Sequence, residues 1–246
     1  GVQLMLDYVI IKSDDETWES KLKSTAVEGL IIASLPPITR AERRVLIDSV
    51  DGRDGDIVTD LGYSAYDKVL GVGLYGHYDT QEILDYFKDR GQIVFSSEPD
   101  KYYEYEIIKQ IDLERVIRFK KGEITFHVQP YKYPVYESKI TLTSAGSIVN
   151  KGNTISAPIY KFTGNGSINI YIDGDKVLGM VIDSGGYITI DTETLEASAN
   201  GVLKNRYVSG DYEKLRLKAG STAISWDTNS YGSLTSVEIS RYTRWI

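Results

Sequence analysis

The chain has 246 residues, of which 41% are hydrophobic and 26% charged, and its net charge is −7. This composition is that of an ordinary globular protein and excludes a fibrous or disordered chain. The absence of cysteine excludes a disulfide framework, a thiolate metal site and a thiol nucleophile. We expect no membrane helix, since no apolar run approaches the roughly 20 residues needed, and no signal peptide, since Asp7 interrupts the first apolar stretch.

The excess of acidic residues lies in the first half of the sequence. Residues 1–134 hold 17 basic and 24 acidic side chains, whereas residues 135–246 hold 11 of each. A net negative charge is the wrong sign for binding nucleic acid, because phosphate binding needs clustered Lys and Arg. The negative charge is compatible with an acidic surface along which DNA moves without binding.

The first half predicts a mixed domain with one clear helix. Asp79 can cap a helix whose apolar face includes Ile83 and Phe87, and Gly91 is expected to end it. Strands are predicted next, in "KYYEYEIIKQI" and "GEITFHVQP", because apolar and polar residues alternate there. A domain boundary is expected near residue 134, in the tyrosine-rich, proline-flanked stretch "QPYKYPVYES".

Residues 135–246 predict an all-β sandwich. Ile168, Ile170 and Ile172 recur at period two and are followed by Asp173-Gly174, which is a strong hairpin signal. The rest of this half repeats the style, with short β-branched runs punctuated by Gly, Asn, Ser and Asp. About 110 residues is the ordinary size of one sandwich domain.

The stretch "SVDGRDGDIVTDLGYSAYD", residues 49–67, looks like a ligand loop and fails as one. A calcium EF-hand starting at Asp51 would place Arg53 at the third position, where an oxygen ligand is required. A phosphate cradle needs its glycines to open a helix, whereas "GRDGD" leads into an extended run. The stretch therefore predicts a turn in which glycine supplies positive φ and aspartate bonds the backbone. We expect no metal and no cofactor.

Catalysis has no local support in the sequence. The two histidines, His77 and His127, are most simply a residue before the helix cap and a surface strand residue. There is no nucleophile elbow and no paired-histidine zinc motif. We therefore assign no catalytic residue and expect the protein not to be an enzyme.

Sugar binding is the alternative that the second half raises. Tyr160, Tyr171 and Trp226 on an all-β module could stack on sugar rings, as a lectin-like module for host attachment would require. The competing interpretation is core or edge packing, which we favour because aromatic residues are common wherever sheets pack.

Four stretches together resemble the distal tail protein (Dit) family of bacteriophages with long, non-contractile tails and of related prophages. Each motif alone is weak, but their order and spacing across nearly the whole chain are specific. They are "VDGRDGDIVTDLGYSAY", "FSSEPDKYYEYEIIKQIDLER", "GEITFHVQPYKYP" and the terminal "LKAGSTAISWDTNSYGSLTSVEISRYTRWI".

The resemblance implies a mainly-β protein of two domains. Residues 1–134 would form a β-sandwich-like, α+β unit with one helix and a protruding hairpin, and copies of it would close into a homohexameric ring. Residues 135–246 would form a galectin-like sandwich on the outside of the ring. The ring would join the tail tube protein to the tail-tip hub protein at the virion tail tip, with DNA passing through its lumen and receptor-binding proteins as further partners.

If copies of the chain form a ring, residues 51–55 can contribute to the contact between neighbouring copies. A ring needs heterologous contacts, in which one surface of each copy fits a different surface of the next. We hypothesise that Asp51, Gly52, Arg53, Asp54 and Gly55 shape a loop at the contact between subunits, in which the arginine offers a planar fork to a neighbouring carboxylate. Replacing this arginine with alanine should then weaken ring assembly more than folding.

Overall fold

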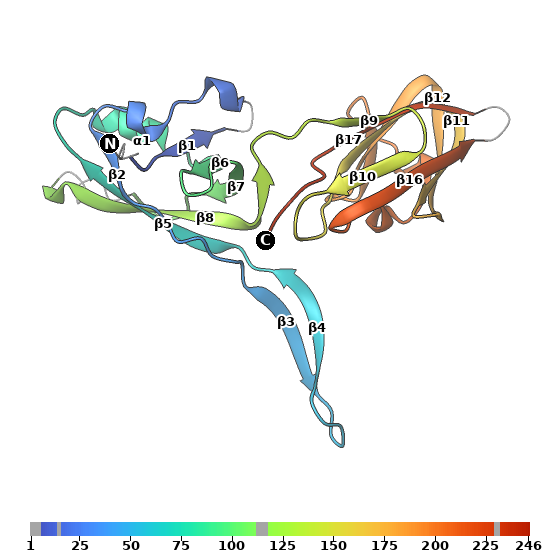
Figure 1. Ribbon diagram of the computed structural model, residues 1–246, viewed down its shortest axis with the longest axis horizontal. Helices are drawn as coiled ribbons and strands as arrows, with labels where there is room; N and C mark the ends of the chain where they lie inside the picture. Colours follow the sequence, from blue (N-terminus) through green and yellow to red (C-terminus); the bar gives the residue numbers. More distant parts are fainter. Residues whose placement is uncertain (1–5, 14–15, 112–117, 229–231) are drawn as a thin grey trace, which may run out of the picture. The chain divides into compact units, whose positions relative to one another are not determined.

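The computed structural model describes residues 6–13, 16–111, 118–228 and 232–246. The chain divides into two compact units, residues 1–135 with Ile246 and residues 136–245, which we call unit 1 and unit 2. Parts of two of the quoted motifs, residues 112–115 and 229–231, lie outside the described residues. The protein is mainly β, as the sequence predicts, with antiparallel sheets in both units (Figure 1).

Unit 1 is built on a six-stranded antiparallel sheet in the order β1-β6-β7-β8-β5-β2, beside a separate two-stranded sheet of β3 and β4. Its strands and helix are β1 (Val9–Lys12), β2 (Leu30–Ser34), β3 (Arg43–Ser49), β4 (Asp56–Tyr63), β5 (Tyr66–Leu74), α1 (Thr80–Tyr86), β6 (Arg90–Phe95), β7 (Lys101–Glu106) and β8 (Lys121–Pro134), with short 3-10 turns at Trp18–Ser20 and Ser24–Ala26.

The core of unit 1 follows from the alternation in its strands. Ile124, Phe126 and Val128 of β8 are 2% exposed or less, as the period-two pattern predicts. Helix α1 contributes Ile83 to the same core. Its start is confirmed at Asp79, whose Oδ1 accepts hydrogen bonds from the backbone N–H groups of the first turn at 2.8 and 3.4 Å.

The expectation that Gly91 ends this helix is wrong. The helix ends at Tyr86, and Gly91 lies inside β6 with a φ of 148°, opposite Tyr105 of β7. A Cβ at this position would stand 2.2 Å from the carbonyl oxygen of Lys12. Glycine is therefore needed for the close approach of two strands and has no part in the helix.

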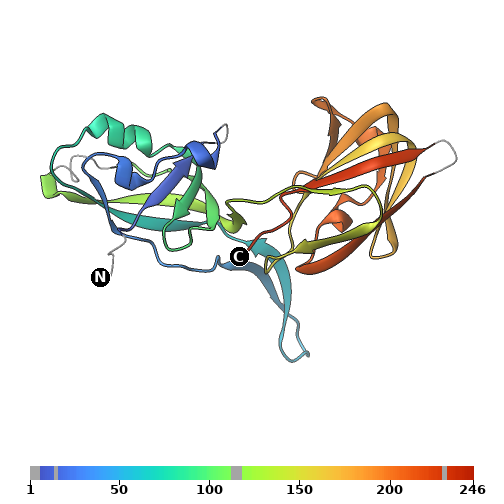
Figure 2. The ribbon, with the colours of Figure 1, turned by 45° about the horizontal axis from the view of Figure 1, so that its top comes forward.

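Unit 2 is a sandwich whose two layers share two long strands (Figure 2). The first half of β11 pairs with β17 and its second half pairs with β16, while β12 pairs along the length of β11. Both halves bury alternate residues in one core, as the layers of a sandwich do. The elements are β9 (Ile140–Leu142), β10 (Gly146–Asn150), β11 (Ile159–Ile172), β12 (Asp175–Asp191), β13 (Glu196–Ala199), β14 (Val202–Leu203), β15 (Val208–Gly210), β16 (Gly220–Thr228) and β17 (Ser233–Ser240), with 3-10 turns at Asn205–Tyr207 and Tyr212–Leu215.

The predicted hairpin of unit 2 is present. Asp173 and Gly174 join β11 to β12 with φ values of 50° and 93°, the positive angles that a two-residue turn of this type requires. Ile168 and Ile170 in the preceding strand are fully buried.

The exposed arm as a candidate assembly surface

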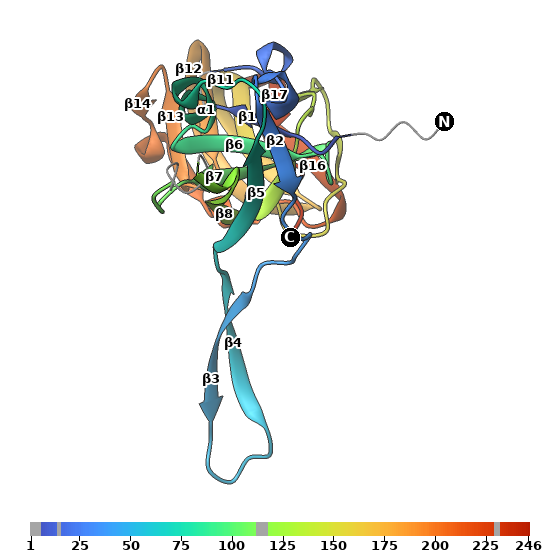
Figure 3. The same ribbon diagram turned by 90° about the vertical axis from the view of Figure 1, so that its left-hand side faces the viewer.

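Strands β3 and β4 form an arm, residues 43–63, that leaves the six-stranded sheet as a separate ribbon (Figure 1 and Figure 3). The two strands pair with each other in antiparallel register, and β3 and β4 pair with no other named strand of the described chain. The outer edges of both strands therefore present backbone N–H and C=O groups that no ladder satisfies.

The arm exposes apolar side chains on both of its faces. Ile47 and Val58 stand opposite each other on one face and are 57% and 52% exposed. Leu46 and Ile57 lie at alternating positions on the other face and are 51% and 38% exposed. Because cross-strand partners share a face and successive residues alternate, neither face of the arm is buried against unit 1 along these positions.

An arm of this kind cannot stabilise itself. A two-stranded hairpin alone is at best marginally stable in water, because it has no layer on which to bury its apolar side chains. Exposed hydrophobic residues scattered singly need no explanation, whereas a contiguous group on one element marks a contact surface. The arm is therefore a candidate contact surface.

The turn at the tip of the arm holds the residues that the sequence singled out. Asp51, Arg53 and Asp54 are exposed, and Gly52 and Gly55 adopt φ values of 81° and 77°. The backbone N–H of Arg53 donates to the carbonyl of Val50 at 3.2 Å, which closes the turn. Open space surrounds both glycines, so they serve the positive φ of a tight turn and no close approach. All five predicted residues thus meet in one exposed turn.

The base of the arm carries an ordered ion pair. The guanidinium of Arg43 contacts the carboxylate of Asp60 at 2.8 Å, and the backbone N–H of Gly62 donates to the same carboxylate at 2.9 Å. The hydrogen bond from Gly62 and then the guanidinium hold the pKa of Asp60 below its usual range. The pair is solvent-exposed and fixes the strand register at the base more than it adds stability.

The three residues proposed for sugar contact do not form one platform. Tyr160 is fully buried in the core of unit 2, where its hydroxyl donates to the carbonyl of Leu215 at 2.8 Å, so its assignment to a sugar site is wrong. Trp226 is opposite Ile170 and packs against the core, whereas Tyr171 is opposite Ser225 on the other face of the sheet. No stacking surface joins them.

The hydroxyl of Tyr171 is engaged within the chain. It donates to Oδ2 of Asp227 at 2.7 Å, while Asn169 donates to Oδ1 of the same carboxylate at 2.6 Å. These two bonds, that of Tyr171 first, lower the pKa of Asp227. The cluster ties β11 to β16 on the exposed face of the sheet.

The two histidines lie on different segments of unit 1. His127 of β8 pairs with Asp67 of β5, with 2.9 Å between Nδ1 and Oδ1, and His77 lies in the connection before α1. Among the residues that the structure describes, no three His, Cys, Asp or Glu side chains converge as a metal site needs. Over the same residues, no helix has the length and apolar character to span a membrane.

The resemblance implied a protruding hairpin and the run after the turn was expected to be extended, but the exposed apolar side chains of the arm were not predicted from the sequence. The motif "GRDGD" draws attention to the turn, whereas the apolar side chains lie in the strands on either side of it. Val45, Leu46 and Ile47 follow one another without a polar residue between them, so no period-two pattern assigns them to a face. This unbroken apolar run next to the turn is the one signal in the sequence that could have predicted a strand with exposed apolar side chains on both faces.

No family model and no curated protein sequence matches this chain. Among solved structures, it is similar to the Dit protein of phage SPP1, described as a paradigm of the hub adsorption apparatus in phages that infect Gram-positive bacteria. The TM-score is 0.62 at 15% identity, over 98% of this chain and 100% of that one. Two structures of the phage P2 baseplate in its activated conformation, with Ca and with Sr, have TM-scores of 0.47 and 0.48 at 11% identity, over 99% and 96% of this chain and 99% and 98% of theirs. The chain has the fold of the SPP1 Dit protein along nearly its whole length, as the sequence resemblance implied.

Proposed function

We propose that this protein is a distal tail protein, a structural component of a phage tail tip. Six copies of unit 1 close into a ring that joins the tail tube to the tail-tip hub, and DNA passes through the lumen of the ring. The observation that carries the proposal is the arm, with exposed apolar side chains on both faces and two open strand edges. The fold of the SPP1 Dit protein, a hub component, supports it.

The arm gives the contact its polarity. A ring forms when one surface of a copy fits a different surface of the next and the rotation between them closes. The arm is such a surface, because it projects from the sheet of its own unit and is uncovered there. Each copy then contributes one arm and receives one, and Arg53, which is exposed at the tip, would offer its guanidinium to a carboxylate of the receiving copy.

The charge of unit 1 agrees with a lumen for DNA. Residues 1–134 carry seven more acidic than basic side chains, 24 against 17. A channel with excess acid on its wall repels the phosphate backbone and lets DNA move through without sticking. The role is one of assembly, and it assigns the chain no reaction and no cofactor.

Shortening the arm tests this proposal. Val45 and Asp60 are opposite each other in the register, so an Asn-Gly turn that joins them directly removes residues 46–59 and leaves the Arg43–Asp60 pair in place. We expect the shortened protein to keep the thermal stability of the full chain and to lose ring formation in electron micrographs. Rings of unchanged number and size would contradict the role of the arm.

A further inference from the structure

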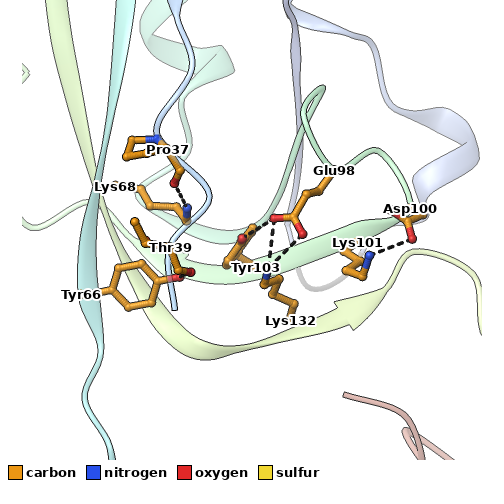
Figure 4. Close-up of polar contacts among 9 residues, drawn as sticks. All are labelled: Pro37, Thr39, Tyr66, Lys68, Glu98, Asp100, Lys101, Tyr103 and Lys132. Atoms are coloured by element: carbon orange, nitrogen blue, oxygen red, sulfur yellow. Dashed lines mark hydrogen bonds and ion pairs between the residues drawn. The ribbon is translucent and has the colours of Figure 1, made fainter. Parts of the chain in front are cut away.

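The arm leaves the six-stranded sheet through a linker, residues 35–42, in which Pro36 and Ala41 are buried and the carbonyl of Glu42 accepts a hydrogen bond from the backbone N–H of Ser64 at 2.9 Å. Pro36 and Pro37 are separated from the end of β2 by Leu35 and have no N–H groups, so neither can donate to a neighbouring strand. Two further carbonyls of the linker are bound by side chains of β5 (Figure 4). Lys68 Nζ donates to the carbonyl of Pro37 at 2.9 Å, and Tyr66 Oη donates to that of Thr39 at 3.4 Å.

Lys68 is an unusual residue to find at this place. It is only 3% exposed, and its ammonium lies 4.8 Å from the ring centre of Tyr103 and 5.6 and 5.7 Å from those of Tyr66 and Phe95. Three aromatic faces thus surround the cation and offset part of its lost hydration. Burying an ammonium group is costly unless it is hydrogen-bonded, so a lysine at this buried position calls for a specific partner.

The nearby carboxylate is already engaged. Glu98, in the turn between β6 and β7, accepts hydrogen bonds from Lys132 Nζ at 2.9 and 3.1 Å and from Tyr103 Oη at 2.7 Å (Figure 4). Although burial alone would raise the pKa of Glu98, the bonds from Lys132 and Tyr103 hold it below its usual range. Among the described residues, the Pro37 carbonyl is therefore the hydrogen-bond acceptor of the Lys68 ammonium.

We infer that Lys68 is a positioning residue for the arm: it holds the Pro37 carbonyl and so fixes the direction in which the arm leaves unit 1. The consequence for ring closure rests on the proposed function, while the hold on the linker does not. Without this bond the arm would sample a wider range of directions about its remaining contacts, and assembly weakens in proportion to the fraction of time spent in the direction that fits.

The protonation state of Lys68 provides a direct readout of this contact. Burial lowers the pKa of Lys68 to about 8, with the charge of Glu98 opposing the shift and that of Lys132 adding to it. The titratable groups that face the ammonium are therefore Glu98, Lys132, Tyr103 and Tyr66, from four different segments of unit 1. A carbonyl that accepts from this ammonium must sense its loss of a proton.

The sequence supplies an internal control for the measurement. Proline precedes isoleucine only at Pro37–Ile38 and at Pro158–Ile159. Labelling proline at its carbonyl carbon with 13C and isoleucine with 15N therefore gives two signals in a carbonyl–amide NMR spectrum. The carbonyl of Pro158 accepts from the hydroxyl and the backbone N–H of Thr192, which do not titrate near pH 8.

We expect the Pro37–Ile38 signal to shift with pH with a midpoint near 8, while the Pro158–Ile159 signal stays in place. Lys68→Met should abolish the pH dependence and sharpen the Pro37–Ile38 signal as the linker becomes mobile, while thermal stability is kept. The matched control is Lys121→Met, which replaces an exposed lysine at the first residue of β8 and should change neither signal. A Pro37–Ile38 signal that does not titrate in the natural chain would overturn the inference even if Lys68→Met fails to fold.

Sedimentation then separates the inference from the proposed function. If the arm without its anchor spends about a tenth of its time in the fitting direction, Lys68→Met raises the dissociation constant of assembly about tenfold. Rings that form equally well in Lys68→Met, with the linker demonstrably released, would refute the positioning role. A natural chain that forms no ring under any condition would refute the proposed function and leave the NMR result standing.

Discussion

Replacing the apolar pair at the middle of the arm should break assembly without unfolding the monomer. Ile47 and Val58 are opposite each other in the register and are 57% and 52% exposed in the single chain. In Ile47→Thr/Val58→Thr the β-branched shape is kept, so the strand preference of both positions changes little. What changes is the apolar surface that a neighbouring copy would cover.

The magnitude follows from the exposed fractions. Full burial of an Ile or Val side chain is worth about 1.5–3 kcal/mol, and about half of each side chain is exposed and would be covered in the proposed ring. Each substitution therefore removes on the order of 1 kcal/mol from one contact, to which the cost of burying a hydroxyl is added. Together they should weaken each contact by roughly 30- to 100-fold, since 1.4 kcal/mol is a factor of ten.

Sedimentation velocity over a concentration series measures this effect. The concentration at which rings form should rise by at least about 30-fold. The free energy of unfolding of the monomer should change by less than about 1 kcal/mol. Val149→Thr/Val181→Thr in unit 2 is the matched control, because these side chains are 48% and 51% exposed. Rings that form at the same concentration in the arm variant and in the control would refute the reasoning.

Three further predictions rest on single residues. Arg53→Ala at the exposed tip should weaken ring formation in sedimentation while the melting temperature stays within error of the natural chain, and an equal loss of both would assign the arginine to folding instead. The free energy of unfolding should rise between pH 8 and pH 10 by up to about 1.4 kcal/mol per pH unit, because Lys68 loses its proton near pH 8 in the folded chain and near pH 10.5 in the unfolded chain. Denaturant titrations of the natural chain and of Lys68→Met should differ in this pH dependence, and an identical pH dependence would show that Lys68 is not its cause. Asp79→Ala should cost about 1 kcal/mol of unfolding free energy, since the carboxylate accepts two hydrogen bonds from the first turn of α1, and Asp79→Asn should recover most of it; an unchanged alanine variant would show that the cap contributes nothing measurable.

The elements that the sequence predicts well are those whose pattern is local. The alternation of Ile124, Phe126 and Val128 identifies a strand and its buried face at once, because a strand side chain changes face at every residue. The helix start at Asp79 and the hairpin turn after Ile172 depend on one or two residues with distinctive backbone preferences. Such features need no knowledge of the rest of the fold.

The features that escaped prediction depend on distant residues. The alternating pattern places Tyr160 on one face of β11 but does not show that this face is the core. Its aromatic character suggested a role at the surface, which the complete burial of Tyr160 rules out. Gly91 lies shortly after the helix, but the reason for glycine is the carbonyl of Lys12, nearly eighty residues away in the sequence. Lys68 reads as a solvated lysine until the linker and three aromatic rings are brought around it.

The most direct test of ring assembly is the mass of the purified protein in solution. Mass photometry and sedimentation velocity, over concentrations up to the solubility limit, should show a species of six copies, six times 27.6 kDa or about 166 kDa, and micrographs of that species should show sixfold rings. The same chain with its arm shortened to the Val45–Asp60 turn should stay at the mass of one copy. A natural chain that remains a 27.6 kDa monomer at every concentration would contradict the account.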